Sequence, residues 1–495
     1  MCVEKAAPSK EEVIPSKQPR TCPSVGDPIN PSIGNNYRKQ ADYRSAGRFA
    51  LVFDRYYNSD SSVRPSHLGS HWRQTYDRAI RTEEATADTV TVDRQDGRSF
   101  VFQREGGKWA ADPDVTDSLT EVTSASGIRS GWRYTTANDT TETYDAQGRL
   151  QSIVARGGFT QTLGYDSAGR LASVTDSAGR AIALEYDESG RLATLRDPAG
   201  DSYQYAYDGA GNLASVTYPD GQERHYLYQD ESYPHALTGI VDANGNRYAT
   251  WAYDAQGRAT LSEHGDGADK VEITYNDDGS ATVKDAGGAT SKYSFDVIYG
   301  VEKTAAVDGS ACSSCGAGVA SYTYDDNGFP ASRTDRNGNT TTYDYNARGL
   351  QTRRTEAAGT PEERTVTTEW SPDFRLPVQV TAPNKVTTYS YDDHGRLLSR
   401  TERDPDTGAS RTVSYTYNDL GLVTSVDGPR TDVADITTYQ YDAQGNRTVM
   451  TNALGQSTRF TAYDPNGRPL TIVDPNGLET HLAYDARGRL ISRDT

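Results

Sequence analysis

Two neighbouring stretches decide the fold: residues 165–171, Tyr-Asp-Ser-Ala-Gly-Arg-Leu, and residues 186–192, Tyr-Asp-Glu-Ser-Gly-Arg-Leu, which begin 21 residues apart. The aspartate can accept a hydrogen bond from its own backbone two residues on, which favours a turn. The glycine suits a left-handed conformation that closes a hairpin with a bulge. Each stretch therefore predicts a tight hairpin turn, and a β-branched residue at Gly169 or Gly190 is expected to destabilise it.

The Tyr-[Asp/Asn]-x-x-Gly pattern recurs in phase along most of the chain. Three gaps in the series are near twice the usual period, and we expect degenerate copies at Tyr228, Tyr299 and Trp370 to fill them. With these copies the chain contains about 16 units of ~21 residues. The clear copies begin at Tyr144, Tyr165, Tyr186, Tyr207, Tyr253, Tyr275, Tyr324, Tyr345, Tyr391, Tyr417, Tyr441, Tyr463 and Tyr484.

A second turn lies halfway through most units, as at residues 176–179 and 197–200. Turns every 10 or 11 residues predict an all-β chain. The composition agrees, because the chain has 33 Tyr against 9 Phe, and Tyr, Val and Thr favour strands. A flat ribbon of residues 141–495 would be roughly 160 Å wide at ~4.8 Å per strand. Sheets that wide curl, so tandem hairpins are expected to wind into a spiral or hollow shell.

Three regions are expected along the chain. Residues 1–26 are polar and proline-rich and predict a disordered tail. Residues 27–140 contain short strands and turns without the period, which predicts a smaller β-rich domain that covers one edge of the ribbon. Residues 141–495 hold the repeats, with a loop insert near 300–318.

Arginine often follows the turn glycine, and its guanidinium is expected near the ring or carboxylate of a neighbouring unit. Four units represent the residues to which we assign a structural repeat role. They are Tyr144, Asp145, Gly148, Arg149, Tyr165, Asp166, Gly169, Arg170, Tyr186, Asp187, Gly190, Arg191, Tyr484, Asp485, Gly488 and Arg489.

The charge and hydropathy exclude several classes of partner. The net charge of −18 opposes binding to nucleic acid or anionic lipid. No apolar run approaches the ~20 residues of a transmembrane segment, and the first residues lack the apolar stretch of a signal peptide. No motif for a catalytic residue, nucleotide or cofactor is present, so no catalytic site and no cofactor are predicted.

The candidate ligand sites have simpler structural interpretations. Cys312 and Cys315 are weak candidates for metal or redox chemistry, but zinc needs a second ligand pair and none is evident. A loop insert, with a local disulfide between them as an option, is favoured instead. The turn aspartates have the wrong period for a calcium repeat. Exposed Tyr and Trp are candidates for stacking on sugars, but packing of the rings in ladders between hairpins explains the periodic Tyr better. The five tryptophans are Trp72, Trp109, Trp132, Trp251 and Trp370.

The motif Tyr-Asp-x-x-Gly-Arg-Leu at residues 144–150, 165–171, 186–192, 391–397 and 484–490 resembles the rearrangement-hotspot (RHS), or YD-repeat, family. Residues 26–59 look like the domain that precedes the repeats in bacterial members. The resemblance implies a β-strand shell that, in bacterial toxins, encloses a C-terminal effector. Family toxins also carry a self-cleavage segment after the repeats. Residues 474–478 resemble it only superficially, because they sit in phase as a turn.

We therefore expect a non-catalytic shell or scaffold part of a polymorphic toxin, C-terminally truncated, with its effector missing from this chain. The expected partners are an effector domain, or immunity or secretion-system proteins, and the chain is expected to be secreted or at the cell surface. The alternative is a carbohydrate-binding or adhesion module at the cell surface, with a glycan as its ligand.

Overall fold

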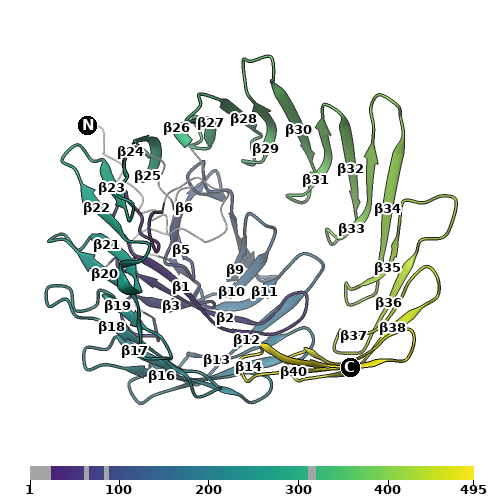
Figure 1. Cartoon of the computed structure of the whole chain (residues 1–495), viewed down its shortest axis with the longest axis horizontal. Coiled ribbons are helices and arrows are strands. Elements are labelled where there is room, and N and C mark those ends of the chain that lie inside the picture. The colour runs from purple at the N-terminus through teal and green to yellow at the C-terminus, as the bar shows by residue number, and fades with distance from the viewer. Residues whose placement is uncertain (1–23, 61–65, 83–87, 310–318) are drawn as a thin grey trace.

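The computed structural model describes residues 24–60, 66–82, 88–309 and 319–495. About half of the chain is strand, at 54%, and only 1% is helix. The single helical element among the described residues is the short 3-10 turn η1 (Gly265–Gly267). The protein is thus all-β, as the turn spacing predicts, and its strands wind round to form a shell (Figure 1).

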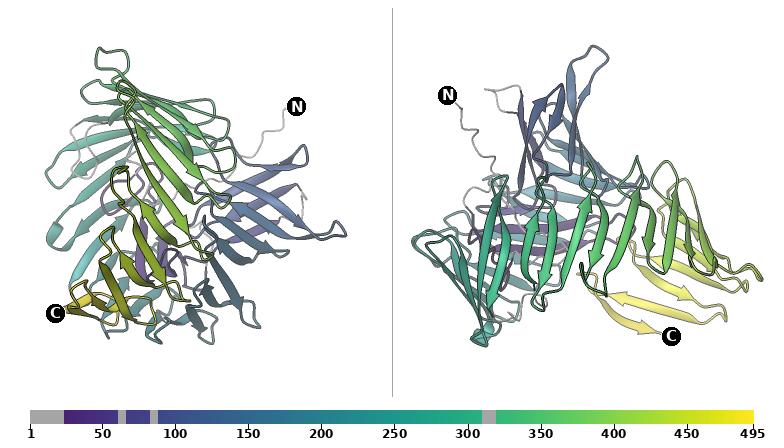
Figure 2. Two further views of the ribbon diagram at one scale, coloured as in Figure 1. Left: turned by 90° about the vertical axis from the view of Figure 1, so that its right-hand side faces the viewer. Right: turned by 90° about the horizontal axis from the view of Figure 1, so that it is seen from above.

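One continuous sheet, which we call the wall, contains every strand from β8 to β41. Each strand pairs antiparallel with the next along the chain, so the wall is a succession of hairpins standing side by side (Figure 2). The predicted winding of tandem hairpins into a shell is confirmed. In its first half the wall consists of β8 (Ser118–Thr123), β9 (Arg129–Thr135), β10 (Thr141–Asp145), β11 (Leu150–Val154), β12 (Thr160–Tyr165), β13 (Leu171–Asp176), β14 (Ala181–Tyr186), β15 (Leu192–Arg196), β16 (Ser202–Tyr207), β17 (Leu213–Thr217), β18 (Glu223–Leu227), β19 (Gly239–Val241), β20 (Arg247–Tyr253), β21 (Ala259–His264), β22 (Val271–Tyr275), β23 (Ala281–Asp285), β24 (Thr290–Ile298) and β25 (Val301–Gly309).

The second half of the wall continues in the same order without a crossover. It consists of β26 (Val319–Tyr324), β27 (Pro330–Asp335), β28 (Thr340–Tyr345), β29 (Gln351–Glu356), β30 (Arg364–Trp370), β31 (Pro377–Ala382), β32 (Lys385–Tyr391), β33 (Leu397–Arg403), β34 (Ser410–Tyr417), β35 (Val423–Asp427), β36 (Thr437–Tyr441), β37 (Arg447–Thr451), β38 (Ser457–Tyr463), β39 (Pro469–Val473), β40 (Glu479–Tyr484) and β41 (Leu490–Asp494).

The hairpin turns have the predicted chemistry. At residues 166–170 the Asp166 N–H donates to the Arg170 carbonyl, and the Gly169 N–H donates back to the Asp166 carbonyl. The Asp166 carboxylate accepts from the N–H groups of Ala168 and Arg170, 2.9 Å each. Gly169 and Gly190 have φ of 79° and 77°, the left-handed region expected of them. The register shifts beside Tyr165, which is the bulge that accompanies such turns.

Two smaller sheets precede the wall. The inner sheet, β1 (Tyr37–Arg44), β2 (Val52–Asn58) and β3 (Trp72–Gln74), lies inside the curve of the wall against the strands near β12 to β20 (Figure 1). A four-stranded sheet follows, formed by β4 (Ala79–Thr82), β5 (Thr89–Asp93), β6 (Ser99–Glu105) and β7 (Lys108–Ala110). The main hydrophobic core joins these sheets to the wall and extends only as far along the chain as Val307.

The wall sheet begins before the first repeat, because β8 and β9 at residues 118–135 belong to it. The expected division at residues 140 and 141 stays a prediction. Most of the predicted tail, residues 1–23, lies outside the described residues. Within the predicted loop insert, β25 is a strand that pairs with β24, while residues 310–318 lie outside the described part.

The last turns of the wall meet earlier turns at a contact that we call the seam. Asn466 is 1% exposed; its amide oxygen accepts from the Tyr43 hydroxyl at 2.7 Å, and its amide nitrogen donates to Asp197 at 2.9 Å. Arg487 pairs with Asp220 at 2.8 Å. Turns near the end of the wall are therefore held against turns of its first half and against β1.

Candidate functional site: the repeat clasp and the inner wall

Aspartate, arginine and tyrosine form a recurring contact between units, which we call the clasp. The Arg170 Nε donates to the Asp166 carboxylate at 2.8 Å, and its guanidinium lies 4.6 Å from the ring centroid of Tyr186 in the next unit. The Tyr186 hydroxyl donates to the Leu171 carbonyl at 2.7 Å. The ring thus comes from the neighbouring unit, as expected, whereas the carboxylate belongs to the arginine's own turn because it also caps that turn.

The surroundings of the clasp shift the pKa values of its tyrosine and its aspartate. Burial raises the pKa of the Tyr186 hydroxyl, which keeps it a neutral donor. The backbone N–H of Arg170 is the main cause of the lowered pKa of Asp166, followed by hydrogen bonding and attraction to the arginine side chain. Both shifts favour the protonation states that the clasp needs at neutral pH.

The same stacking of arginine on the next tyrosine recurs round the wall. The other instances join Arg149 to Tyr165, Arg191 to Tyr207, Arg258 to Tyr275, Arg396 to Tyr417 and Arg468 to Tyr484, at 5.5, 4.5, 4.2, 5.1 and 5.3 Å from the ring centroid. Arg489 instead pairs with Asp485 of its own turn and with Asp220 across the seam.

The hydroxyl bond to the preceding unit extends further than the arginine contact and was not predicted from the sequence. The surplus of Tyr over Phe is the signal that could have revealed it. Trp370 keeps the bond in a degenerate unit by donating its indole N–H to the Gln351 carbonyl at 2.9 Å. The tyrosine donors are Tyr165, Tyr186, Tyr207, Tyr228, Tyr253, Tyr275, Tyr324, Tyr345, Tyr391, Tyr417, Tyr441 and Tyr463.

Two of the degenerate or terminal units depart from this scheme. Tyr144 opens the series and directs its hydroxyl to Glu142 instead of a preceding hairpin. Tyr299 sits at the turn between β24 and β25 with φ of 51°, and its hydroxyl bonds the Asp326 carbonyl. Tyr299 is therefore a turn residue and not a clasp tyrosine.

The residue two positions before each repeat tyrosine points into the shell, and we call this series the inner row. Tyr205 and Tyr226 of the inner row meet the inner sheet at a buried ion pair. Arg55 binds Asp42 through two hydrogen bonds of 2.6 and 2.9 Å, Tyr226 accepts from Arg55 at 2.8 Å, and Tyr205 donates to Asp42 at 2.8 Å. Trp72 stacks on the same guanidinium.

A second buried ion pair fixes the neighbouring part of the N-terminal region to the inner row. Glu142 accepts from Arg94 at 2.6 and 2.8 Å and from Arg78 at 2.5 Å. Burial alone would raise the pKa of Glu142, but the two guanidinium groups outweigh it and lower the pKa to about 2. The carboxylate is therefore charged at neutral pH and holds two arginines in place.

The inner row differs between the two halves of the wall. In the first half its members are all buried, and they are Glu142, Leu163, Leu184, Tyr205, Tyr226, Trp251 and Ile273. In the second half, beyond Tyr322, its members are only partly buried. They are Tyr343, Thr368, Tyr389, Tyr415, Tyr439, Leu482 and, displaced by a bulge, Phe460. The inner sheet covers the first half only (Figure 1).

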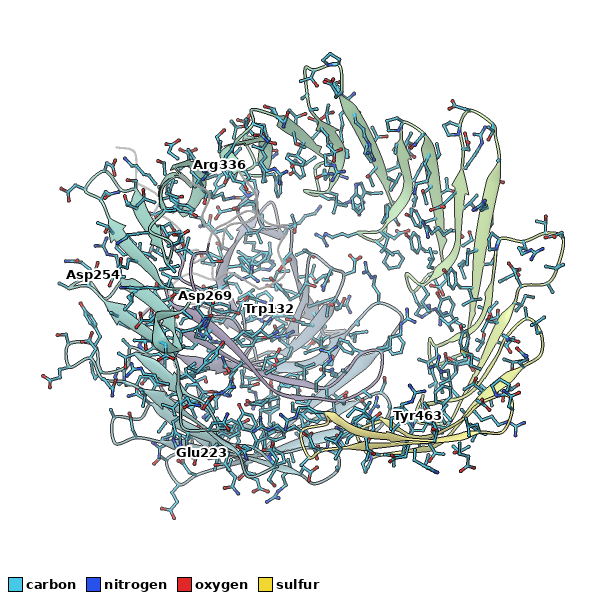
Figure 3. The ribbon with its side chains drawn as sticks, viewed as in Figure 1. Trp132, Glu223, Asp254, Asp269, Arg336 and Tyr463 are labelled. Atoms are coloured by element: carbon cyan, nitrogen blue, oxygen red, sulfur yellow. The ribbon has the colours of Figure 1, made fainter. Side chains whose placement is uncertain are left out.

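Some side chains on the inside of the wall are buried, whereas others lie at its outer margin. Trp132, fully buried on β9, lies within the ring of strands, whereas Glu223 and Asp254 lie at its outer margin (Figure 3). Trp72 and Trp251 are also buried, and Trp370 uses its indole N–H in a clasp. Stacking of tryptophan on sugars stays an untested alternative.

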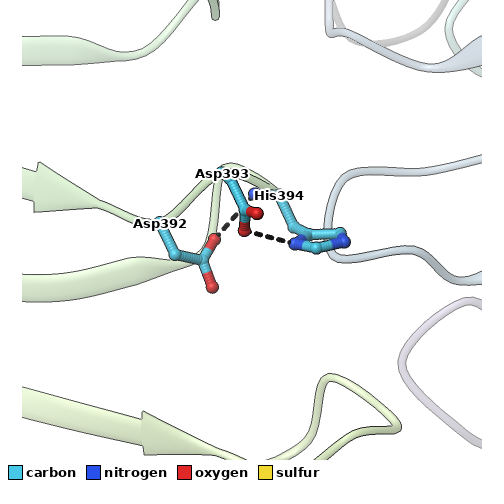
Figure 4. A group of neighbouring side chains, drawn as sticks. All are labelled: Asp392, Asp393 and His394. Atoms are coloured by element: carbon cyan, nitrogen blue, oxygen red, sulfur yellow. Dashed lines mark hydrogen bonds and ion pairs between the residues drawn. The ribbon is translucent and has the colours of Figure 1, made fainter.

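A group of three potential metal ligands, Asp392, Asp393 and His394, lies on an exposed turn (Figure 4). Asp392 is the turn cap and accepts from the backbone of His394 and from Arg396, while His394 contacts Asp393 at 2.6 Å. These hydrogen bonds explain why the three side chains lie close together: they belong to a capped hairpin turn of the kind seen in the clasp. Cys312 and Cys315 lie outside the described residues, so their interpretation stays a prediction.

Residues 474–478, which superficially resemble a self-cleavage segment, form an ordinary turn. The Asp474 carboxylate accepts from the N–H groups of Asn476 and Leu478, and Gly477 has φ of 85°. The carboxylate thus has the capping role seen at Asp166.

Comparison with known sequence families matches most of the chain. The family described as Teneurin YD-shell matches residues 103–307, and the RHS Repeat family matches residues 324–361, 417–458 and 463–495. A domain of unknown function (DUF6531) matches residues 26–102. The chain belongs to the RHS/YD-repeat family. A search of curated proteins found no match to this RHS/YD-repeat chain.

Solved structures similar to this RHS/YD-repeat protein include toxin complexes. The crystal structure of TcdB2-TccC3-Cdc42 has a TM-score of 0.43 and 14% identity, over 94% of this chain and 28% of that one. A Photorhabdus luminescens Tc holotoxin pore with a mutated TccC3 has a TM-score of 0.47 and 13% identity, over 96% of this chain and 29% of that one. This protein therefore spans less than a third of the toxin chains with which it aligns.

Proposed function

We propose that this chain is the non-catalytic shell of an RHS-repeat toxin and that it encloses a C-terminal effector. The observation that carries the proposal is the difference between the two halves of the inner row. The first half is buried under the N-terminal region, whereas the second half presents a partly exposed tyrosine face to the inside of the curved wall (Figure 1). Such a face can contact a guest polypeptide without competing with the wall's own core.

A toxin shell acts outside the cell that makes it, so we propose secretion or display at the cell surface, with immunity or secretion-system proteins as further partners. No helix in the described part of the chain is long and apolar enough to span a membrane. The role assigned to the chain is structural, because the titratable groups of the clasp and of the buried ion pairs are engaged in holding strands together.

Protease protection tests this proposal. An unstructured reporter segment carrying many cleavage sites is fused after Thr495, and its digestion by a non-specific protease is compared with that of the same segment fused to an unrelated folded protein. Enclosure predicts much slower digestion in the shell fusion, and denaturing the shell must abolish the difference. Equal digestion rates in the two fusions under native conditions would exclude enclosure.

A further inference from the structure

The uncovered part of the inner wall carries positive charge although the whole chain is strongly acidic. Side chains alternate between the two faces of a strand, so residues paired directly opposite the inner row also point inward. Arg333, Arg354, Arg400 and Arg493 lie opposite Tyr322, Tyr343, Tyr389 and Leu482 of the inner row. Cations therefore interleave with the aromatic rings along this face.

Three more cations share the inward positions of their strands: Arg364, Lys385 and Arg411. The carboxylates in phase with them are Glu356, directly opposite Arg364, and Glu402, directly opposite Arg411. Asp335 is also in phase, but it caps the following turn.

The two glutamates are already engaged. Glu356 pairs with Arg354 at 2.7 Å, and Glu402 pairs with Arg400 and, at 3.6 Å, with Lys385. Cations on this face thus outnumber carboxylates by more than two to one. The net charge of the whole chain is −18, so the inner face has the opposite sign to the molecule.

The charged groups are accessible from inside the shell. The Arg354, Arg400 and Lys385 side chains are 42, 45 and 52% exposed. Guanidinium groups bind carboxylates in a planar, two-pronged geometry, and tyrosine offers both a ring face and a hydroxyl. Because the face is concave and walled, its field is concentrated on whatever it surrounds.

We propose that this inward face binds extended polypeptide segments rich in aspartate, glutamate and aromatic residues, which makes them the preferred guest of the shell. The inference rests on the proposed enclosing function and adds the chemistry of the guest. Inner-row residues recur on every second strand, about 10 Å apart, which corresponds to about three residues of extended chain. A segment running across the strands can therefore meet a ring or a cation at each step.

A single-stranded nucleic acid is also anionic and stacks on aromatic rings. The net charge of −18 opposes its approach from solution, whereas a segment carried on the same chain needs no diffusional encounter. The charge distribution therefore favours an acidic polypeptide over a nucleic acid.

The test uses the fusion described above with three reporters of equal length and aromatic content. In one the charged positions are Glu, in the second Gln and in the third Lys. The Glu reporter is expected to be digested most slowly and the Lys reporter fastest. The preference should shrink at high salt, because screening lengths fall to about 3 Å at about 1 M salt.

Neighbouring arginines supply matched variants. Arg354→Gln with Arg400→Gln removes two inward cations, whereas Arg353→Gln with Arg403→Gln removes outward cations from the same strands. The inward pair is expected to speed digestion of the Glu reporter roughly fivefold, since exposed ion pairs contribute modestly. The outward pair should leave it unchanged, and thermal unfolding confirms that both variants are folded.

The outcomes separate the two proposals. Equal protection of all three reporters would overturn the charge preference and leave enclosure standing. No protection of any reporter would overturn both. A fluorescent oligodeoxynucleotide that binds the wild-type chain, and loses binding only in the inward variant, would overturn the polypeptide assignment in favour of nucleic acid.

Discussion

Most repeat tyrosines donate the hydroxyl to the main chain of the preceding hairpin, and several also carry an arginine from the same neighbour over the ring. Tyr186 shows both contacts, with its hydroxyl on Leu171 and the Arg170 guanidinium over its ring. A phenylalanine would keep the ring contact and lose only the hydrogen bond. The substitution therefore isolates one part of the clasp.

Tyr186→Phe is expected to destabilise the chain by about 1 kcal/mol, the usual contribution of one hydrogen bond. Urea unfolding followed by tyrosine fluorescence measures the change. Tyr248→Phe is the control, because Tyr248 is 44% exposed and is expected to behave like wild type. An unchanged unfolding midpoint in Tyr186→Phe would show that the hydroxyl bond does not contribute.

Glu142 gives the protein an acid-sensitive contact. Its folded pKa of about 2 lies below its ordinary value of 4.5. A lowered folded pKa means that the stabilisation is fully present above pH 4.5 and is lost as the pH falls towards 2. Glu142→Gln should abolish this part of the acid dependence.

At neutral pH the same substitution leaves Arg94 buried without its charged partner, which is expected to cost about 3 kcal/mol. Thermal unfolding between neutral pH and pH 2 measures both effects, and Glu223→Gln, on an outer strand position, is the control. A pH profile of Glu142→Gln that parallels wild type would refute the assignment.

At the scale of the element, the hairpin turn depends on one left-handed glycine. The turn at residues 208–211 contains two glycines, of which Gly211 has φ of 84° and Gly209 does not lie in the left-handed region. A Cβ at either glycine would meet no atom within 4 Å. Backbone conformation alone therefore distinguishes them.

Gly211→Ala is expected to destabilise the chain by about 1–2 kcal/mol, whereas Gly209→Ala should be neutral or slightly stabilising. Gly169→Val should behave like Gly211→Ala, with φ of 79° at that position. Thermal unfolding compares the three. Equal effects at Gly209 and Gly211 would contradict the turn geometry.

The sequence predicted these turns because their signal is local. Asp166 and Gly169 are three residues apart, and their chemistry needs no distant partner. The Tyr186 hydroxyl bond and the buried Arg55–Asp42 pair were missed, because they join segments whose proximity depends on how the ribbon curls. The Cys312–Cys315 prediction and the boundary near residue 140 stay predictions, because both cysteines lie outside the described residues and no observation tests the boundary.

At the scale of the whole molecule, closure depends on one of two identical tetrapeptides. Asp-Pro-Asn-Gly occurs at residues 464–467 and again at 474–477. Asn466 is buried in the seam, whereas Asn476 is exposed. The same local sequence therefore has different roles because of where the wall meets itself.

Asn466→Ala is expected to loosen the seam, because Tyr43 and Asp197 each lose a buried hydrogen-bond partner, at about 1–3 kcal/mol for the pair. Hydrogen exchange should accelerate in the turns near residues 197 and 466. Asn476→Ala should leave exchange there unchanged. Acceleration in both variants would place the effect in the turn and not in closure.

The clasp has a consequence for how such walls change during evolution. In the units that follow Tyr144 the bonded hydroxyl donates to a main-chain carbonyl. The acceptors include Leu171, Thr304, Pro330 and Arg447, which share no side-chain chemistry. A duplicated or deleted hairpin would therefore find a compatible neighbour without any compensating mutation. Duplication or deletion of repeat units in the gene can then lengthen or shorten the wall while the contact between neighbouring units stays the same.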